Sequence, residues 1–275
     1  MTATSLLSTI RARASAVLKS SNHPRIRGIW DLSCDFRPSP SERAFRYRIV
    51  VAQTVTQGSC YYSGSALPSA LLSKLVGCPY SGVEELPLAL EIALLDSLFK
   101  NTDDDFDEVG QLTGTSTEKA HKRSNILCRE VDLLIARCRL ARPPRVAVIG
   151  VVSLAVLLLH ERGYEVRGAD LDQNLIGTVV GDTGITVEPG EQTLALVRDA
   201  DVALVSGMTL STGTLDEILE AARSSGTRVV LFAQTGSNLA AVYRDAGIDT
   251  IVSEPFPFYI FDGTTRFAIS RRGRE

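Results

Sequence analysis

The sequence predicts an α/β protein whose C-terminal half is a Rossmann-like domain with a mostly parallel sheet and a terminal β-hairpin. The main observation is that apolar segments such as 145–150 (RVAVIG) and 228–233 (RVVLFA) alternate with helical segments along this half. Repeated strand–helix units with apolar strands form a parallel sheet that helices cover on both faces. A length of 275 residues with 44% hydrophobic residues suffices for one large domain or two modest ones.

The second observation is the segment Arg142-Pro143-Pro144, which divides the chain. Proline cannot continue a helix, so the helical segment that precedes this point has to end there. Beyond it the pattern changes to alternating strands and helices. We therefore predict a smaller N-terminal α+β domain with a leading helix over residues 1–142 and the Rossmann-like domain over residues 143–275.

The leading segment allows two interpretations. It contains no acidic residue from Met1 to Trp30 and is rich in Arg, Ser and Thr, as organelle transit peptides are. Its apolar residues nevertheless recur at helical spacing, which favours an amphipathic helix packed on the body of the protein. These residues are Leu7, Ile10, Ala14, Val17 and Leu18.

The remaining N-terminal elements follow from local patterns. Residues 46–54 (RYRIVVAQT) have a β-branched centre and predict a strand, and the glycine-bracketed residues 58–64 predict a turn or loop. Residues 86–99 are apolar and rich in helix formers, so they predict a core helix. Thr115 and Glu118 have the spacing of a capping box, which starts another helix. We also expect a short helix at 68–76, an acidic loop at 101–108, and the end of the capped helix near residue 139.

In the Rossmann-like domain, we expect strands at 145–150, 165–169, 201–206, 228–233 and 250–253, and helices at 154–162, 194–199, 215–224 and 239–246. The closing hairpin is predicted from residues 258–261 and 266–270, which flank Asp262-Gly263, a dipeptide typical of tight hairpin turns.

Composition excludes several classes of function. The net charge is only −3 with a pI near 5.7, so we expect no nucleic-acid partner. No stretch approaches 18 uninterrupted apolar residues, so we expect no membrane-spanning segment. The five cysteines form no CxxC pair, and no secretory signal is present, which favours reduced cysteines and a cytoplasmic location. A small-molecule ligand is the expected partner, with a homodimer as a further possibility.

In an open α/β sheet, ligands bind outside the carboxyl ends of the strands. The first strand ends at Gly150, but Val151 and Val152 replace the glycines of a dinucleotide-binding GxGxxG loop. Gly150 therefore either contacts a ligand or forms a structural turn. Asp170 ends the second strand, 20 residues later, where an acid can accept hydrogen bonds from ribose hydroxyls or can simply cap a turn.

Two further strand ends are polar loops that lead into helices. Hydroxyl-rich loops of this kind bind carboxylates or phosphates, because backbone N–H groups and the helix dipole point outward there. Thr214 is equally suited to an ordinary helix N-cap. The predicted ligand-binding residues are Ser206, Gly207, Thr209, Ser211, Thr212 and Thr214 in the first loop, and Gln234, Thr235, Ser237 and Asn238 in the second.

Three residues are candidates for chemistry rather than binding. Glu254 follows the fifth strand and precedes a proline, which keeps it extended, so it is a candidate base or amine ligand. A structural salt bridge is the alternative for the same residue. Tyr61 and Tyr62 either close an interdomain cleft over the ligand or pack within it.

One segment carries a family resemblance. Residues 207–216 (GMTLSTGTLD) resemble the G-T-T-L-x-N-x-T-L-D stretch of a Rossmann-like family described as "putative heavy-metal chelation". This resemblance implies an enolase-N-like N-terminal domain, whose final apolar helix residues 86–99 are similar to. Two departures are that residues 234–237 (QTGS) replace the family's G-P-S, and that the terminal hairpin is not typical of it.

The strand–helix series also resembles the fold of adenosyl-methionine-dependent transferases, through the acid after the second strand and the closing antiparallel hairpin. The favoured hypothesis is therefore a small-molecule enzyme, transferase- or cyclase-like, that binds S-adenosyl-methionine at the sheet edge, with specialised metabolite biosynthesis as the pathway class it suggests. The alternative is a non-catalytic protein that binds a metal or a metal chelate. Its candidate ligands are Cys60, His121 and Glu254, although they show no spacing typical of a metal site.

Overall fold

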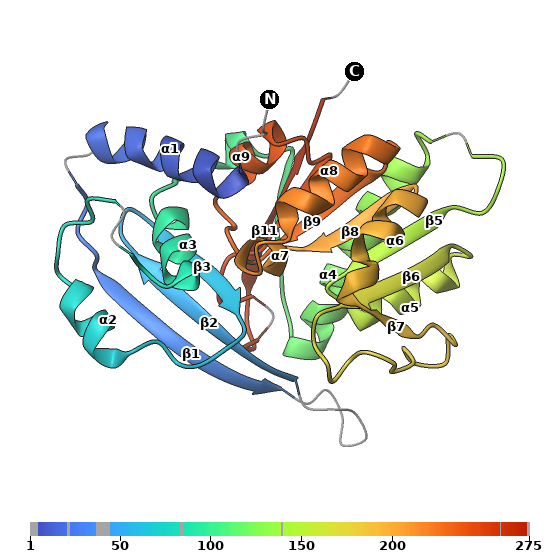
Figure 1. Ribbon diagram of the computed structural model, residues 1–275, viewed down its shortest axis with the longest axis horizontal. Helices are drawn as coiled ribbons and strands as arrows, with labels where there is room; N and C mark the ends of the chain where they lie inside the picture. Colours follow the sequence, from blue (N-terminus) through green and yellow to red (C-terminus); the bar gives the residue numbers. More distant parts are fainter. Residues whose placement is uncertain are drawn as a thin grey trace.

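The computed structural model describes residues 5–20, 23–36, 45–82, 85–138, 140–258 and 260–273. Two sheets lie beside each other, a small one built from the N-terminal residues and a large one built mainly from the C-terminal residues (Figure 1). The predicted α/β class, with a mostly parallel main sheet, is confirmed. The N-terminal elements are α1 (Leu6–Ser20), β1 (Gly28–Phe36), β2 (Phe45–Gln53), β3 (Gln57–Tyr62), α2 (Ser69–Leu75) and α3 (Leu88–Asp96).

The small sheet has the antiparallel order β1-β2-β3. The prediction of a turn or loop at 58–64 is wrong, because Gln57 to Tyr62 form strand β3. Gly58 is needed there for packing: a Cβ on it would lie 2.3 Å from the Ala93 carbonyl oxygen of α3. This glycine therefore marks close approach of a strand to a helix instead of a turn.

The leading helix is confirmed as α1. Leu6, Ile10, Ala14 and Leu18 are buried, and they share one core with α3 and the inner face of β2. Ile10, Ala14 and Leu18 were predicted for this face, whereas Leu6 was not, and the predicted Leu7 and Val17 are only partly buried beside it. Its first turn is also fixed to the C-terminal half, because the Leu6 amide donates to Asp216 Oδ1 at 2.9 Å.

The large sheet has the order β4-β11-β10-β9-β8-β5-β6-β7. Strands β10, β9, β8, β5, β6 and β7 run parallel, whereas β11 and β4 are antiparallel to their neighbours. Helices α4 and α5 pack on one face, and α6, α8 and α9 pack on the other together with α1 and α3. The elements are β4 (Glu108–Leu112), α4 (Ser116–Ile135), β5 (Arg145–Ile149), α5 (Ser153–Glu161), β6 (Glu165–Asp170), β7 (Val187–Pro189), α6 (Thr193–Asp199), β8 (Val202–Ser206), α7 (Met208–Ser211), α8 (Leu215–Ser225), β9 (Arg228–Ala233), α9 (Ala240–Asp245), β10 (Thr250–Ser253) and β11 (Thr265–Arg271), with short 3₁₀ turns at Asp103–Asp105 and Gly190–Gln192.

The closing antiparallel strand is present, but its predicted partner is wrong. β11 pairs with β10 on one side and β4 on the other, and residues 258, 260 and 261 lie in the connecting loop. That loop is drawn inward by Lys119 of α4, whose ammonium donates to the Phe258 and Phe261 carbonyl oxygens. Phe258 itself is fully buried against the small sheet. Tertiary contacts thus override the local strand pattern.

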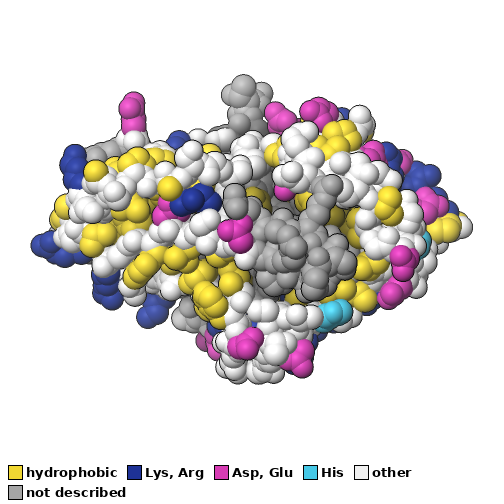
Figure 2. Space-filling view, turned by 90° about the horizontal axis from the view of Figure 1, so that it is seen from below, with side chains coloured by type: hydrophobic (Ala, Val, Ile, Leu, Met, Phe, Trp, Pro, Cys, Tyr) yellow, Lys and Arg dark blue, Asp and Glu magenta, His cyan; other side chains and the backbone are white. Residues whose placement is uncertain are grey.

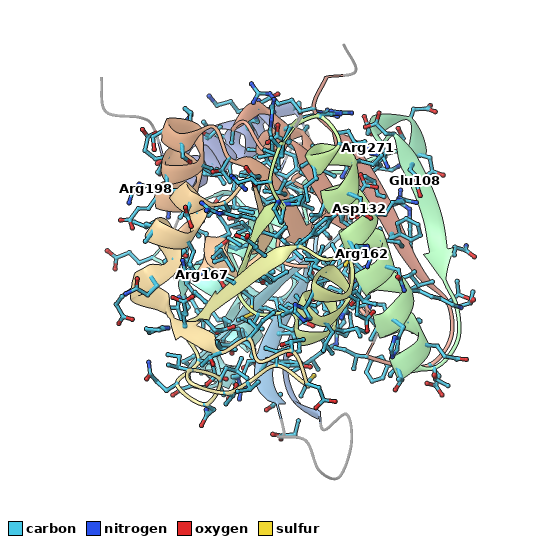
Figure 3. The ribbon with its side chains drawn as sticks, turned by 90° about the vertical axis from the view of Figure 1, so that its right-hand side faces the viewer. Glu108, Asp132, Arg162, Arg167, Arg198 and Arg271 are labelled. Carbon is cyan, nitrogen blue, oxygen red and sulfur yellow. The ribbon has the colours of Figure 1, made fainter. Side chains whose placement is uncertain are left out.

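Two elements that precede residue 143 belong to the large sheet and its helical layer. β4 is the edge strand beside β11, and α4 carries the capping box that Thr115 and Glu118 predicted. An ion-pair network fixes this edge: Arg271 of β11 donates to the buried Glu130 from its Nε and Nη2 atoms, each at 2.8 Å, and its Nη2 also donates to Glu108 of β4 at 3.1 Å. Figure 3 labels Arg271 and Glu108 at this edge. The domain boundary at residue 143 stays a prediction.

Seen from below, hydrophobic side chains gather over the half of the molecule formed by the small sheet and α2 (Figure 2). Trp30 and Val76, with 47% and 42% of their surface exposed, belong to this half. Within the described residues, no helix combines the length and the apolar character needed to cross a membrane.

Candidate functional site

A cleft of about 1200 Å³ lies at the carboxyl ends of β5, β6, β8 and β9. Its opposite wall comes from the small sheet, through Tyr47, Arg48, Tyr61 and Tyr62, and from the first half of α4. From β5 the chain moves outward to β6 and β7, and then returns to place β8 on the other side of β5. The cleft is therefore at the topological switch point, where open α/β sheets bind their ligands.

Gly150 lies on the cleft surface where β5 and β8 end. Its φ of +73° favours glycine, and a Cβ on it would lie 2.6 Å from the Cβ of Ser206. The close approach of the two strand ends thus accounts for Gly150 without any ligand. Val151 and Val152 also line the cleft and give it an apolar floor at this point.

Asp170 also lines the cleft, at the end of β6. Its Oδ2 accepts the Val151 amide at 2.7 Å, and its Oδ1 accepts the Asp172 amide at 2.9 Å. The carboxylate therefore ties the β5–α5 turn to the loop after β6. A carboxylate has about four acceptor positions in total, so this structural role leaves acceptor capacity on both oxygens.

The loop between β8 and α8 presents most of its predicted residues to the cleft, and Ser211 is the exception. Its hydroxyls are largely used within the loop, since Thr209 donates to the Ser206 carbonyl at 2.7 Å and Thr212 donates to the Thr209 carbonyl at 3.3 Å. Helix α8 then begins with Asp216 and Glu217 in its first turn. These two negative charges disfavour a ligand anion at this helix start.

All four polar residues of the loop after β9 were predicted to bind the ligand, but only part of this loop lies at the cleft. Gln234 and Thr235 line the cleft, whereas Ser237 and Asn238 do not. Asn238 instead donates to the Gln57 carbonyl at 2.8 Å, and Thr235 Oγ1 accepts the Tyr61 amide at 3.0 Å. We call residues 234–238 the inter-sheet clamp, because their contacts join the large sheet to β3.

Asp96, at the end of α3, is a buried acceptor that joins the inter-sheet clamp to β3. Sequence analysis did not identify it. Its Oδ1 accepts the Asn238 amide at 2.8 Å and its Oδ2 accepts the Ser59 amide at 3.0 Å. Burial raises the pKa of Asp96 to about 7, although the backbone donors lower it in part. Asp96 lies near the end of the apolar segment 86–99 that predicted the core helix. An acid at that place in a sequence looks the same whether it ends a helix in solvent or is buried.

Glu254 lies behind the cleft wall and is fully buried. Its Oε2 accepts a hydrogen bond from Gln234 Nε2 at 2.7 Å, and Arg123 Nη1 lies 3.8 Å from the same oxygen. Burial raises the pKa of Glu254, against the opposing effect of the Arg123 charge. Glu254 does not line the cleft itself, but its partners Gln234 and Arg123 do.

Tyr61 and Tyr62 both line the cleft, with different environments. The Tyr61 ring stacks on Phe258 at 5.1 Å and meets Tyr47 edge-to-face at 5.5 Å, so it forms an aromatic wall. The Tyr62 hydroxyl donates to Asp31 at 2.8 Å and accepts from Arg48 at 3.0 Å. Burial and the Asp31 contact raise the pKa of Tyr62, which disfavours its ionised form.

Helix α4 brings Thr117, Ala120, His121 and Arg123 to the cleft; sequence analysis had named His121 as a candidate metal ligand but missed the other three. Arg123 forms an ion pair with the buried Glu254, and its guanidinium lies over the Phe232 ring at 5.2 Å. The available signal was the pair Lys119 and Arg123, which lie four residues apart and therefore on the same face of a helix as the apolar Leu127, Val131 and Leu134.

The side chains fit a protein-bound metal poorly. Among the described residues, no three His, Cys, Asp or Glu side chains come close enough to hold one ion. Of the three candidate ligands, Cys60 and Glu254 are fully buried, and burial raises the pKa of the Cys60 thiol. Metal-binding cysteines need the thiolate, so this thiol is a poor ligand.

The fold and the cleft define a class of two-sheet α/β proteins with a ligand-sized cleft at the switch point of the parallel sheet. Residues 132–253 match the model of the family DUF364, described as "Putative heavy-metal chelation". This match supports the family resemblance drawn from residues 207–216. The enolase-N-like character of the N-terminal domain stays a prediction.

Two solved structures have the same overall fold. A protein with unknown function from the DUF364 family of Desulfitobacterium hafniense is 11% identical, with a TM-score of 0.55 over 94% of this chain and 98% of that one. A DUF364 protein with unknown function from Pyrococcus horikoshii is 13% identical, with a TM-score of 0.53 over 97% and 100%. A search of curated proteins found no match.

Proposed function

We propose that this chain is a small-molecule enzyme that binds an adenosyl-type ligand, with S-adenosyl-methionine favoured, in the cleft between its two sheets. The observation that carries the proposal is the position of Asp170, which ends the strand next to the switch-point strand β5 and lines the cleft. An acid at this position accepts hydrogen bonds from ribose hydroxyls in nucleotide-binding α/β folds. Its bonds to two backbone amides fix its orientation before a ligand arrives.

The walls of the cleft support an amphipathic ligand of this size. Val151, Val152 and Leu157 supply an apolar surface beside Asp170, and Tyr47 and Tyr61 supply aromatic rings on the opposite wall. Ligand sites of 300–1,000 Å³ with mostly apolar walls and a few fixed polar groups are typical of cofactor binding, and this cleft is slightly larger. The space therefore suits a nucleoside-sized ligand with a second substrate beside it.

Isothermal titration calorimetry with S-adenosyl-methionine, S-adenosyl-homocysteine and NAD tests the proposal. We expect saturable binding of the two adenosyl compounds, and Asp170→Asn should weaken it about tenfold or more, because hydrogen bonds to a charged acceptor contribute roughly 1.5–3 kcal/mol. Asp182→Asn is the matched control, since Asp182 is exposed and does not line the cleft. Undetectable binding of every adenosyl compound to the wild-type protein would overturn the proposal.

The family description favours a second function, binding of a heavy metal. Since the described residues supply no cluster of metal ligands, the cleft would take a preformed metal chelate in this case. Metal analysis by mass spectrometry after extensive dialysis tests it, with a stoichiometric metal as the supporting result. A metal-free protein whose thermal stability does not respond to chelator or to added metal chelates would exclude it.

A further inference from the structure

The charged side chains that line the cleft carry an excess of negative charge. The acids among them are Asp170, Asp172, Glu191 and Glu217, and the bases are Arg48, His121 and Arg123. Both arginines form ion pairs with acids outside this set, Arg48 with Asp31 and Arg123 with Glu254. None of the four cleft acids forms an ion pair with a described cation. A cationic group on a ligand would therefore be attracted into the cleft.

Gln234, directly after β9, is a buried polar side chain that reaches this cleft. It is only 7% exposed, yet it lines the cleft. Its backbone carbonyl accepts the Ser59 hydroxyl at 2.9 Å, and its side-chain Nε2 donates to Glu254 Oε2 at 2.7 Å. The residue is therefore fixed at both its backbone and its side-chain nitrogen, unlike a glutamine on an open surface.

Glu254 also decides which end of the Gln234 carboxamide faces the cleft. Reversing the amide would place its oxygen about where the nitrogen now lies, 2.7 Å from Glu254 Oε2, and two acceptors would repel each other. A proton on Oε2 would remove this repulsion, but Arg123 Nη1 lies 3.8 Å from the same oxygen and disfavours a proton there. The nitrogen therefore stays on Glu254, and the carbonyl oxygen Oε1 is left for the cleft.

Among the described residues, none donates a hydrogen bond to Gln234 Oε1. This oxygen is also absent from the enclosed polar atoms that lack a partner, so it meets the open space of the cleft. A carbonyl in a mostly buried position gains free energy from a donor, because little water reaches it. A ligand group that donates hydrogen bonds and carries positive charge matches both this acceptor and the acidic cleft.

We infer that Gln234 Oε1 accepts a hydrogen bond from an ammonium group of the ligand, with Glu254 as the residue that positions the carboxamide. Gln234 follows β9 and Asp170 ends β6, and these strands are three strand spacings apart in the sheet order, roughly 14 Å. The two side chains thus suit opposite ends of one extended molecule. This inference rests on the proposed function for the choice of an adenosyl group at the Asp170 end.

The test compares two ligands that differ only in the ammonium group. They are S-adenosyl-homocysteine and its analogue in which hydrogen replaces the amino group. In isothermal titration calorimetry, we expect the wild-type protein to prefer S-adenosyl-homocysteine about tenfold to a hundredfold, because hydrogen bonds to charged groups are the strong ones. Gln234→Met keeps the length of the side chain and removes the acceptor, so it should bring the ratio of the two affinities close to one.

Glu254→Gln tests the positioning role. A carboxamide at position 254 donates as well as accepts, so it no longer holds Gln234 in one orientation. The affinity ratio should fall to a value between those of the wild type and Gln234→Met.

Gln111→Met is the matched control, because Gln111 is exposed on β4 and does not line the cleft. It should keep the wild-type ratio, and circular dichroism shows whether each variant is folded. If Gln234→Met does not fold, Glu254→Gln carries the test. A wild-type ratio in folded Gln234→Met, or a wild type without any preference, overturns the inference while the adenosyl function stands.

The opposite failure is separable with cations that carry no adenosyl group. In thermal-shift titrations at constant ionic strength, putrescine supplies ammonium N–H donors, whereas tetramethylammonium supplies positive charge without them. If no adenosyl compound binds, but putrescine stabilises the wild type more than Gln234→Met and tetramethylammonium does not, the proposed function fails and the ammonium site stands. If no adenosyl compound binds and the two cations act equally, or neither acts, both are overturned.

Discussion

The loop between β8 and α8 and the inter-sheet clamp after β9 look alike in the sequence and differ in the structure. Both follow a buried parallel strand, both are rich in hydroxyl and amide side chains, and both precede a helix. The first presents Ser206, Thr209 and Thr212 to the cleft, whereas the clamp directs Asn238 into contacts with β3. A dense polar loop at a strand end therefore indicates either ligand binding or sheet-to-sheet attachment, and the partner of each side chain decides which.

The difference has an energetic consequence. The Gln234 and Thr235 contacts of the clamp are buried and those of Asn238 are partly buried, so removing one partner leaves a polar group without a hydrogen bond, at a cost of about 1–3 kcal/mol. Hydroxyls of the β8–α8 loop bond to nearby carbonyls at the cleft surface, where water can replace them. We therefore expect clamp substitutions to change stability more than matched substitutions in the β8–α8 loop.

The largest expected effect is a dependence of stability on pH through Asp96. Its folded pKa of about 7 exceeds its ordinary value of 3.8, so the folded state binds a proton that the unfolded state releases. The free energy of unfolding should therefore fall as pH rises from 4 to 7, by up to about 4 kcal/mol for this group alone. The raised pKa of Glu254 acts in the same direction.

Urea unfolding at several pH values measures this dependence. Asp96→Asn should be less stable than the wild type at pH 5, because an amide accepts only one of the two backbone donors while the wild-type acid gains from protonation. The difference between the two proteins should narrow toward pH 8. A constant difference across this range would mean that Asp96 does not titrate there.

Two glycines with positive φ differ in how tightly their surroundings are packed, one in the inter-sheet clamp and one in the β8–α8 loop. Gly236 of the clamp has φ +67°, and a Cβ on it would lie 2.3 Å from the Tyr243 hydroxyl, which is buried. Gly213 of the β8–α8 loop has φ +74°, with no atom within 4 Å of its Cβ position. Gly236→Ala should cost about 3 kcal/mol or more, from the clash and the backbone strain together, and Gly213→Ala about 1 kcal/mol from strain alone. Equal costs in urea unfolding would contradict the packed character of the clamp.

Asn238→Ala should show an intermediate effect. It removes the side-chain bonds to the Gln57 and Asp96 carbonyls, at 2.8 and 3.2 Å, and leaves both acceptors without that partner. We expect a loss of about 2 kcal/mol of unfolding free energy, with ligand affinity in the cleft unchanged. Weakened ligand binding by a folded Asn238→Ala protein would instead support the ligand-binding role that the sequence predicted for Asn238.

The fold was largely predictable, because it depends on strong local patterns. Five strands, β5, β6, β8, β9 and β10, are short apolar segments, and helical segments separate them along the sequence. This alternation is what a parallel sheet covered by helices on both faces requires. The short edge strands β4 and β7 were missed, since an edge strand of three to five residues carries little pattern of its own. Strand β1 was missed because its sequence, GIWDLSCDF, mixes polar and apolar residues without a regular turn signal.

The predicted part of the candidate site lies at the ends of the parallel strands and at Tyr61 and Tyr62 of β3. Gly150, Asp170 and Thr209 were found because parallel topology brings strand ends to one edge. Arg123 was not found, because a helix from before the predicted boundary supplies it, and sequence alone does not show which way α4 faces. Glu254 was placed near the correct edge, but its full burial depends on Gln234 and Arg123 covering it.

The smallest expected effect on stability comes from Thr212→Ala. The Thr212 hydroxyl donates to the Thr209 carbonyl at 3.3 Å and lies 3.0 Å from the Thr214 hydroxyl, in an exposed turn that ends α7. Water can satisfy these groups, so thermal unfolding should change by less than about 0.5 kcal/mol in free energy. Thr212 lines the cleft, and so the same substitution should be visible in calorimetry of the ligand if the β8–α8 loop contributes to binding. A stability loss comparable to that of Asn238→Ala would instead show that both polar loops are structural, and the proposed ligand would then depend on Asp170 and the aromatic wall.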